Sequence, residues 1–383
     1  MRYYIIAGEA SGDLHASNLM KALKEHDSEA DFRCWGGDLM KEQGGELVKH
    51  YRDLAFMGFM EVILHLPTLL RNFSFCKQDI IRYKPDVVIL IDYPGFNLRL
   101  AKFAATHGFR VCYYISPQLW AWHASRVKIL KRFVSRTFVI LPFEKEFYAR
   151  YDYPVDFVGH PLLDVIHEKQ ALPSRNEFLQ QNELKDQPIV ALLPGSRKME
   201  IEKMLRLMLA AIPSFKGYQF VVAAAPSVPA EFYRSIILDP GIKLVFNQTY
   251  ALLKSSEAAL VTSGTATLET ALLGCPQVVC YKGNPLSYAI ARRIVHVNYI
   301  SLVNLIVQKP LVKELIQNEL TKDNLVIELK KILGDTTMRK NIHQGYLDLR
   351  ELLGESGASD RTARLIKQYL IEKKVNSDIN ISK

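Results

Sequence analysis

The stretch YYIIAGEASGDLHASNLMKALKE, residues 3–25, determines the fold expected for the first part of the chain. A short apolar run is followed by a Gly/Ser turn and then by apolar residues at helical spacing, which predicts a strand, a tight loop and a helix. The loop lacks the Gly-x-Gly-x-x-Gly fingerprint and carries two carboxylates, Glu9 and Asp13, which would repel a pyrophosphate. We interpret it as a loop that contacts sugar hydroxyls. The alternatives are a helix cap formed by Ser11 or Asp13 and a cofactor-binding turn.

The same pattern returns in the second half of the chain, in PIVALLPGSRKMEIEKMLRLMLAAI (188–212). Continuous apolar runs such as PDVVILIDYPGFN (85–97) are typical of parallel strands that are buried on both faces. A polar stretch separates the two series. We therefore predict an α/β protein with two doubly wound domains, 1–167 and 188–350, then helices over 351–374 and a disordered polar tail at 375–383.

Charge and composition indicate which kinds of partner and which cellular compartment the sequence favours. The 383 residues carry a net charge of +9, which favours an anionic partner such as nucleic acid, an anionic membrane surface or a phosphorylated substrate. The five cysteines form no Cys-x-x-Cys pair, so we predict buried free thiols in a reducing compartment. The sequence has no signal-peptide pattern, and no apolar run reaches the roughly 20 residues that span a bilayer. We therefore expect a cytoplasmic protein.

A loop of the second half carries residues suited to a phosphate. LLPGSRKMEIEKM (192–204) places Gly195, Ser196 and Arg197 at the start of a predicted helix. Free N–H groups at a helix N-terminus and a guanidinium group both favour phosphate. The alternative is an ordinary turn with a solvated arginine.

A second loop, in SGTATLETALLG (263–274), repeats this arrangement with Ser263, Gly264 and Thr265. Glu269 follows in the early turns of the predicted helix, where its carboxylate can accept hydrogen bonds from both hydroxyls of a ribose. The alternative is a capping box between Thr265 and Glu269, although their spacing is one residue too long. Two such loops in one domain favour a nucleotide-binding site.

An acidic residue follows the buried strand of the first half. In IDYPGFN (91–97), Asp92 stands at the end of the apolar run, and the turn of Pro94 and Gly95 would expose it. A carboxylate there is either a helix-capping acid or a general base.

Two further segments have more than one interpretation. YISPQLWAWHASRVKILKR (114–132) interleaves aromatic and basic residues, which fits single-stranded nucleic acid, lipid headgroups or a substrate phosphate. No RNA-binding motif accompanies it, so we do not expect a nucleic-acid partner. LAFMGFMEVILHLPTLLRNFSF (54–75) is either a core helix or an apolar surface for lipid or membrane.

Taken in order, the motifs of this chain resemble those of lipid-A-disaccharide synthases, which are glycosyltransferases of the GT-B fold. The resemblance extends from about Tyr3 to Tyr369. It is carried by GEASGD, MGFMEV, KPDVVILIDYPGFN, YISPQLWAW, LPFEKEFY, FVGHPL, LLPGSR, SGTATLE and YISLVNLI. Each motif alone is weak, whereas the ordered set is highly specific.

The resemblance implies two Rossmann-like doubly wound domains that face each other across a cleft, with C-terminal helices that cross back onto the N-terminal domain. It also implies transfer of a 2,3-diacylglucosamine unit from UDP-2,3-diacylglucosamine to the 6-hydroxyl of 2,3-diacylglucosamine 1-phosphate, which releases UDP. The donor is α-linked and the product is β-linked, so the transfer would invert in one displacement with one base. Asp92 matches the base proposed for the family, while Glu9 and His15 remain alternatives.

The resemblance also assigns the other site residues to the acceptor side or the donor side of the site. The N-terminal domain would hold the acceptor and face the membrane, with Glu9, Ser11 and Gly12 on the acceptor side. No cofactor and no metal ion would be essential. The protein would lie peripherally on the cytoplasmic face of the inner membrane, against its anionic surface, and whether it forms a homodimer stays open. On the donor side would lie Gly195, Ser196, Arg197, Ser263, Gly264, Thr265, Glu269 and Asn304.

Other functions remain as alternatives. The nearest is another UDP-sugar-dependent GT-B transferase that acts on a lipid-linked acceptor. UDP-sugar hydrolysis or epimerisation is more distant. A non-enzymatic module that binds lipid or nucleic acid would need no base. A dehydrogenase is disfavoured because no predicted strand is followed by Gly-x-Gly-x-x-Gly.

Overall fold

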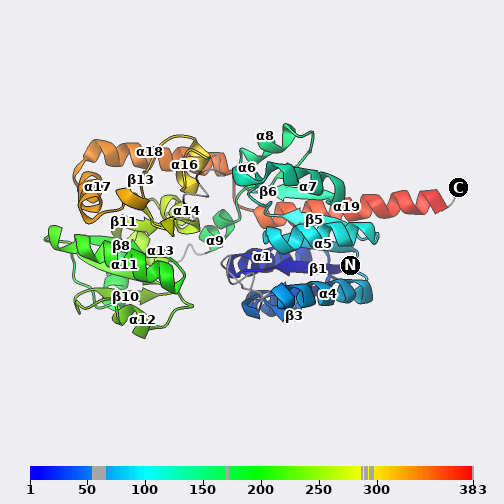
Figure 1. Ribbon diagram of the computed structural model, residues 1–383, viewed down its shortest axis with the longest axis horizontal. Coiled ribbons are helices and arrows are strands. Elements are labelled where there is room, and N and C mark those ends of the chain that lie inside the picture. The colour runs from blue at the N-terminus through cyan, green and yellow to red at the C-terminus, as the bar shows by residue number, and fades with distance from the viewer. Residues whose placement is uncertain (54–65, 169–171, 286–287, 289–291, 293–296, 382–383) are drawn as a thin grey trace. The chain divides into compact units, whose positions relative to one another are not determined.

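The computed structural model describes residues 1–53, 66–168, 172–285, 288, 292 and 297–381. The chain divides into two compact units (Figure 1). The first contains Met1–Glu168 together with Leu353–Lys383, and the second contains Lys169–Leu352. Each unit is built on one parallel sheet with helices on both faces, so the predicted α/β class is confirmed.

The first unit is a seven-stranded sheet in the order β3-β2-β1-β4-β5-β6-β7. The strand order reverses between β1 and β4, so the loops that follow these two strands lie at the topological switch point. The strands are β1 (Arg2–Ala7), β2 (Asp31–Gly36), β3 (Glu46–His50), β4 (Val87–Ile91), β5 (Val111–Tyr114), β6 (Arg136–Val139) and β7 (Asp156–Phe157). The helices are α1 (Ala10–His26), α2 (Asp38–Glu42), α4 (Leu66–Tyr83), α5 (Pro94–Thr106), α6 (Leu119–Trp122), α7 (Val127–Phe133), α8 (Glu144–Ala149), α9 (Leu162–Glu168) and α19 (Ala358–Ile381).

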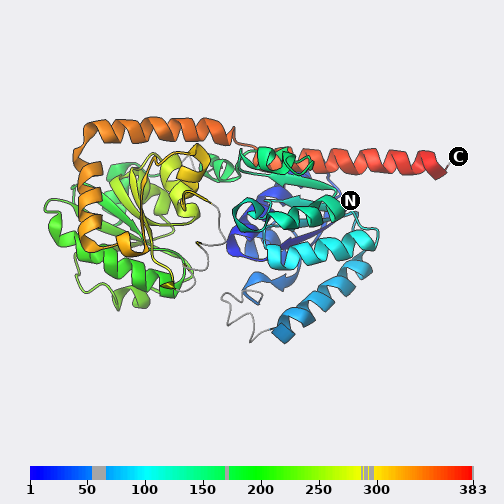
Figure 2. The same cartoon turned by 45° about the horizontal axis from the view of Figure 1, so that its top comes forward.

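Alternating side chains of β1 build a core on each face of this sheet. Tyr4 points into the core formed with α4, α5 and α7, and α4 and α5 lie side by side on that face (Figure 2). Tyr3 points into the opposite core, which includes Ile366 and Leu370 of α19. The last helix of the chain therefore belongs to the first unit, where it packs against α1.

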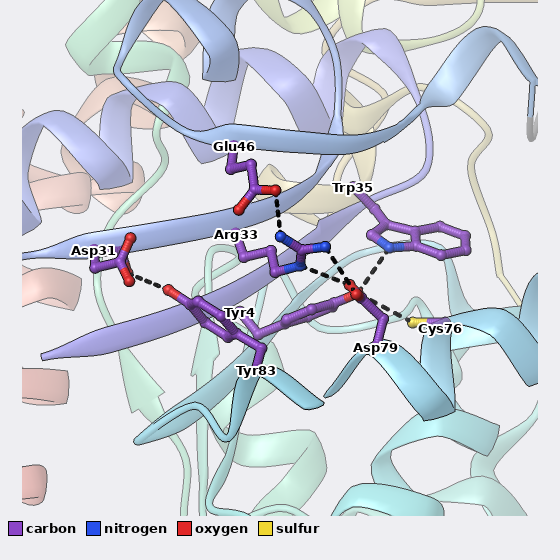
Figure 3. Close-up of polar contacts among 8 residues, drawn as sticks. All are labelled: Tyr4, Asp31, Arg33, Trp35, Glu46, Cys76, Asp79 and Tyr83. Atoms are coloured by element: carbon purple, nitrogen blue, oxygen red, sulfur yellow. Dashed lines mark hydrogen bonds and ion pairs between the residues drawn. The ribbon is translucent and has the colours of Figure 1, made fainter. Parts of the chain in front are cut away.

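A buried cluster of hydrogen-bonded polar residues connects α4 to β1 and β2 (Figure 3). The Asp79 carboxylate is 4% exposed and accepts two hydrogen bonds from Arg33, each of 2.9 Å. It accepts a third, of 2.7 Å, from the Tyr4 hydroxyl, which in turn accepts one from the Trp35 indole. Arg33 also pairs with Glu46. Because each of these groups has a partner, we assign the cluster a structural role.

The second unit is a six-stranded sheet in the order β10-β9-β8-β11-β12-β13, with its switch point between β8 and β11. The strands are β8 (Ile189–Leu193), β9 (Gln219–Ala224), β10 (Lys243–Phe246), β11 (Ser256–Thr262), β12 (Gln277–Tyr281) and β13 (Lys313–Ile316). The helices are α10 (Arg175–Gln181), α11 (Lys198–Ala211), α12 (Ala230–Arg234), α13 (Thr249–Lys254), α14 (Thr265–Leu272), α16 (Leu302–Val307), α17 (Lys322–Gly334) and α18 (Thr336–Leu353).

Several expectations about individual segments can be compared with the structure. All five cysteines are buried free thiols, as predicted. The segment 375–381, expected to be disordered, continues α19 to Ile381, since no Gly or Pro interrupts it. Residues 54–65 of the apolar segment lie outside the described residues, while its remainder opens α4 and exposes Leu70 and Phe75. Within the described ranges, no helix is long and apolar enough to cross a membrane.

Candidate functional site

The switch point of the first unit brings two predicted site loops together. β1 pairs with β4 in a register that sets Ala7 opposite Ile91, so the loops that begin at Gly8 and Asp92 are neighbours. Gly8 is required here because a Cβ atom would come within 2.3 Å of the Tyr93 ring. The Glu9 carboxylate is close enough to Asp92 to influence its ionisation. The structure therefore places the loop of Glu9 next to the loop of Asp92.

Asp92 is held in a backbone conformation that few L-residues adopt. Its φ is 43° and that of Tyr93 is 49°, so two successive residues lie in the left-handed region. The Asp92 carbonyl accepts hydrogen bonds of 2.6 Å from the Tyr113 hydroxyl and 2.8 Å from the Asn97 amide. Asn97 is fully buried in α5. These contacts fix the loop and turn the Asp92 side chain outward, where it is exposed.

The environment of Asp92 makes it more basic. Protein atoms around the carboxylate remove part of its hydration, and the charge of Glu9 adds to this effect, so the pKa rises from 3.8 to about 6. A hydrogen bond from the Tyr93 backbone N–H opposes the rise. A carboxylate with a pKa close to working pH is better matched to general-base catalysis than one with an ordinary pKa.

The GEASGD loop divides into exposed and structural residues. Ser11 is exposed, and Gly12 is buried where a Cβ atom would lie 3.1 Å from that of Ala7, which permits close packing of α1 on β1. Asp13 is 3% exposed and accepts hydrogen bonds from the backbone of Gly37 at 2.7 Å and from two further N–H groups of α2. Asp13 thus caps α2, and the alternative that Ser11 or Asp13 caps α1 is wrong.

The switch point of the second unit brings its two predicted loops together in the same way, because Leu193 pairs with Val261. Gly195 has φ of 114°, which favours glycine. The Ser196 N–H donates a 3.1 Å hydrogen bond to a Glu200 carboxylate oxygen, so an anionic oxygen already fits this loop. Arg197 directly precedes α11 and is exposed.

Glu269 is oriented by a residue that the sequence interpretation missed. The Tyr250 hydroxyl of α13 donates a 2.9 Å hydrogen bond to the Glu269 carboxylate. The N-cap residue of α14 is Gly264, which has no side chain, so the capping-box alternative for Thr265 and Glu269 is wrong. Ser263 donates a 3.2 Å hydrogen bond to the carbonyl of Ile300, while Gly264 and Thr265 are exposed.

Asn304 has the contacts of a supporting residue. It is 1% exposed, and its amide donates hydrogen bonds to the Val312 carbonyl at 2.8 Å and to Glu314 at 2.9 Å. Glu314 of β13 also accepts hydrogen bonds from the backbone of Ile300 and Ser301. Asn304 therefore helps to hold the loop that Ser263 contacts. Glu314 was not singled out in the sequence, because nothing in its local pattern distinguishes it.

A further acid of the first unit was not assigned a role from the sequence. Glu144, in the LPFEKEFY motif, is 1% exposed and accepts hydrogen bonds from the backbone N–H groups of Ile140 at 3.2 Å and Leu141 at 2.9 Å. Burial raises its pKa to about 8, against the effect of these hydrogen bonds and of the Trp120 side chain. The charge of Asp92 contributes to the rise, so Glu144 lies within electrostatic range of Asp92.

The sequence relationships cover the whole molecule. Residues 3–368 match the pattern of the lipid-A-disaccharide synthetase family. A lipid-A-disaccharide synthase of Syntrophus aciditrophicus is 42% identical over 367 residues, which cover 94% of this chain and 95% of that protein. The chain belongs to the lipid-A-disaccharide synthetase family. A second member, from Geobacter sulfurreducens, is 36% identical over 96% of this chain and 97% of its own length.

Solved structures with the same fold include proteins outside this family. A UDP complex of Staphylococcus aureus MnaA superposes with a TM-score of 0.68 at 14% identity, and the match covers 96% of each chain. The kitacinnamycin glycosyltransferase gives a TM-score of 0.64 at 14% identity, covering 96% of this chain and 99% of that one. At such identities these matches establish the fold alone, and the GT-B fold class expected from the sequence is confirmed.

Proposed function

We propose that this chain is the glycosyltransferase that joins UDP-2,3-diacylglucosamine to 2,3-diacylglucosamine 1-phosphate, forming the β-1,6-linked lipid A disaccharide 1-phosphate and UDP. Whole-chain family membership supports this reaction. The observation that carries it is Asp92: a carboxylate held rigidly at a topological switch point, exposed to substrate, with its pKa raised to about 6.

The proposed chemistry is a single displacement. Asp92 takes the proton from the 6-hydroxyl of the acceptor as that oxygen attacks the anomeric carbon of the donor. The bond from this carbon to the UDP oxygen breaks, and UDP leaves with the electron pair, so the configuration inverts. Glu9 keeps Asp92 basic and lies beside the acceptor hydroxyls. Ser11 and Gly12 complete the acceptor-side loop.

We place the donor on the second unit. The N–H groups of Gly195 and Ser196 and the guanidinium of Arg197 would stabilise the leaving pyrophosphate. The pyrophosphate would take the place of the Glu200 carboxylate at the Ser196 N–H. Ser263, Gly264, Thr265 and Glu269 would contact the nucleoside.

In this arrangement Tyr250 presents Glu269 to the ribose. Asn304 acts indirectly, because its amide is already bonded to Val312 and Glu314. It would position the Ile300 loop, which Ser263 contacts.

We also propose peripheral attachment to the cytoplasmic face of the inner membrane through the first unit. Both substrates carry acyl chains, so they partition into a bilayer. Leu70 and Phe75 of α4 are 56% and 46% exposed and offer apolar contact area.

The test is a UDP-release assay with the acylated donor, run with and without the acylated acceptor. Wild type, Asp92→Asn and Glu146→Gln are compared; Glu146 is an exposed acid of α8 that serves as the matched control. We expect release only with acceptor, a loss of at least about 100-fold in Asp92→Asn and no change in the control. Release without acceptor would indicate hydrolysis, and full activity of Asp92→Asn would remove it as the base.

A further inference from the structure

A pocket lined by cationic and apolar side chains lies in the first unit, next to the Asp92 loop. It has a volume of about 380 Å³ and lies between α5 and α7. Pro94 and Gly95, which line it, follow Asp92 directly in the turn that starts α5. The full lining is Pro94, Gly95, Leu98, Arg99, Lys102, Arg126, Ile129 and Phe133.

The charged residues that line this pocket are Arg99, Lys102 and Arg126. Within the part of the chain that the structure describes, the side chains of Arg99, Lys102 and Arg126 make no ion pair and no hydrogen bond. Arg99 and Lys102 are three residues apart on α5, so they project from the same face of the helix. Three unpaired cations around one concavity repel each other unless an anion neutralises them.

The chain between Asp92 and Glu144 (residues 93–143), which contains every residue of the pocket lining, has no acidic residue. The segment therefore carries +8 of the chain's net charge of +9. Its basic residues are Arg99, Lys102, Arg110, Arg126, Lys128, Lys131, Arg132 and Arg136.

The pocket lining also includes apolar side chains. Leu98 is 5% exposed, and Ile129 and Phe133 are half-buried, so a hydrocarbon chain would find apolar contact area in the pocket beside the cations. The volume lies at the lower end of the range for small-molecule sites, which suits a phosphate group and the first part of a chain and not a whole lipid. A phosphate attached to an apolar body is the chemistry that fits.

We propose that this pocket binds the 1-phosphate and the adjoining acyl methylenes of the lipid acceptor. The inference rests on the proposed function and adds a specificity site to it. The pocket is contiguous with the loop of the base, so an acceptor anchored there by its phosphate presents its sugar to Asp92. A phosphate of a membrane phospholipid has the same chemistry, and the test separates the two sources.

The test compares two acceptors that differ only in the 1-phosphate, in detergent micelles. The pocket variant is Arg99→Gln/Lys102→Gln. The control variant is Lys128→Gln/Lys145→Gln, which removes the same charge from exposed residues outside the pocket lining. We expect the pocket variant to lose at least about tenfold in kcat/KM for the phosphorylated acceptor and less than about twofold for the other. The control should change neither, and thermal unfolding checks that all variants fold.

Two results would overturn the inference. Equal losses on both acceptors, or no loss, would show that the cations do not recognise the phosphate. The other result has two parts: the pocket variant no longer sediments with vesicles that contain anionic phospholipid, and its preference between the two acceptors equals that of wild type. That result would assign the pocket to membrane phospholipid instead.

Failure of the proposed function is distinguishable, because wild type would then release no UDP with either acceptor. In that event equilibrium binding of the two acceptors in micelles decides the inference. Weaker binding of the phosphorylated acceptor by the pocket variant alone would support it, and equal binding by wild type of both acceptors would refute it.

Discussion

The pairing of Glu9 with Asp92 predicts how the activity depends on pH. Partial loss of hydration to the surrounding protein atoms and the charge of Glu9 raise the pKa of Asp92 from 3.8 to about 6, and the loss of hydration is the larger cause. A general base acts in its ionised form, so kcat/KM should rise with pH through about 6 and level off above it. Glu9→Gln removes only the smaller cause. We therefore expect the acid limb to move to lower pH, by no more than about one pH unit.

The assay is acceptor-dependent UDP release, with kcat/KM measured from about pH 4.5 to 8. Glu146→Gln is the control, since it removes an exposed carboxylate of the same unit. Glu9 is also proposed to contact the acceptor, so the plateau of Glu9→Gln is expected to fall. The midpoint of the acid limb is independent of the plateau height, and it alone reports the ionisation of the base.

Three outcomes would refute this account. A wild-type acid limb with a midpoint near 4 would mean that the loop does not perturb its acid. A shift of the Glu9→Gln limb to higher pH would mean that Glu9 does not act through its negative charge. A control that shifts as much as Glu9→Gln would show a general effect of net charge.

Three further predictions concern other parts of the structure. Asp79→Asn should lower the free energy of unfolding by about 3 kcal/mol in urea titration, because it breaks a buried ion pair with Arg33; a loss below about 1 kcal/mol would contradict the structural role of the cluster. Tyr250→Phe should raise the KM for the donor several-fold and leave kcat nearly unchanged, because Glu269 loses the hydrogen bond that orients it. A change in the KM for the acceptor alone would contradict the assignment of Glu269 to the donor site. The Glu144 carboxyl has a pKa of about 8 in the folded protein and about 4.5 in the unfolded chain, so the free energy of unfolding should fall as pH rises from 4.5 to 8. Glu144→Gln should flatten this dependence, which is measured by urea unfolding at several pH values in that range.

The sequence by itself determined the elements and the chemical character of the loops. The restart of the strand–turn–helix pattern at Pro188 predicted a second sheet, because alternating apolar runs and helical spacing are local properties. The position of Asp92 after a continuous apolar run predicted its place beyond β4, since parallel strands present their carboxyl ends at one edge. The ordered motifs also identified the family correctly.

Only the tertiary structure decided which polar residues face a partner and which are exposed. Asp13 and Asp92 both follow strand-like runs. The Asp13 carboxylate is buried and accepts hydrogen bonds from backbone N–H groups at the start of α2, whereas Asp92 is exposed. Asn304 matches a family residue, but its amide is already hydrogen-bonded to Val312 and Glu314. These outcomes depend on strand register and helix packing between segments that are far apart in the chain, which no local pattern encodes. The pocket between α5 and α7 also depends on tertiary packing. The basic residues Arg99, Lys102 and Arg126 line one pocket only because these two helices pack against each other.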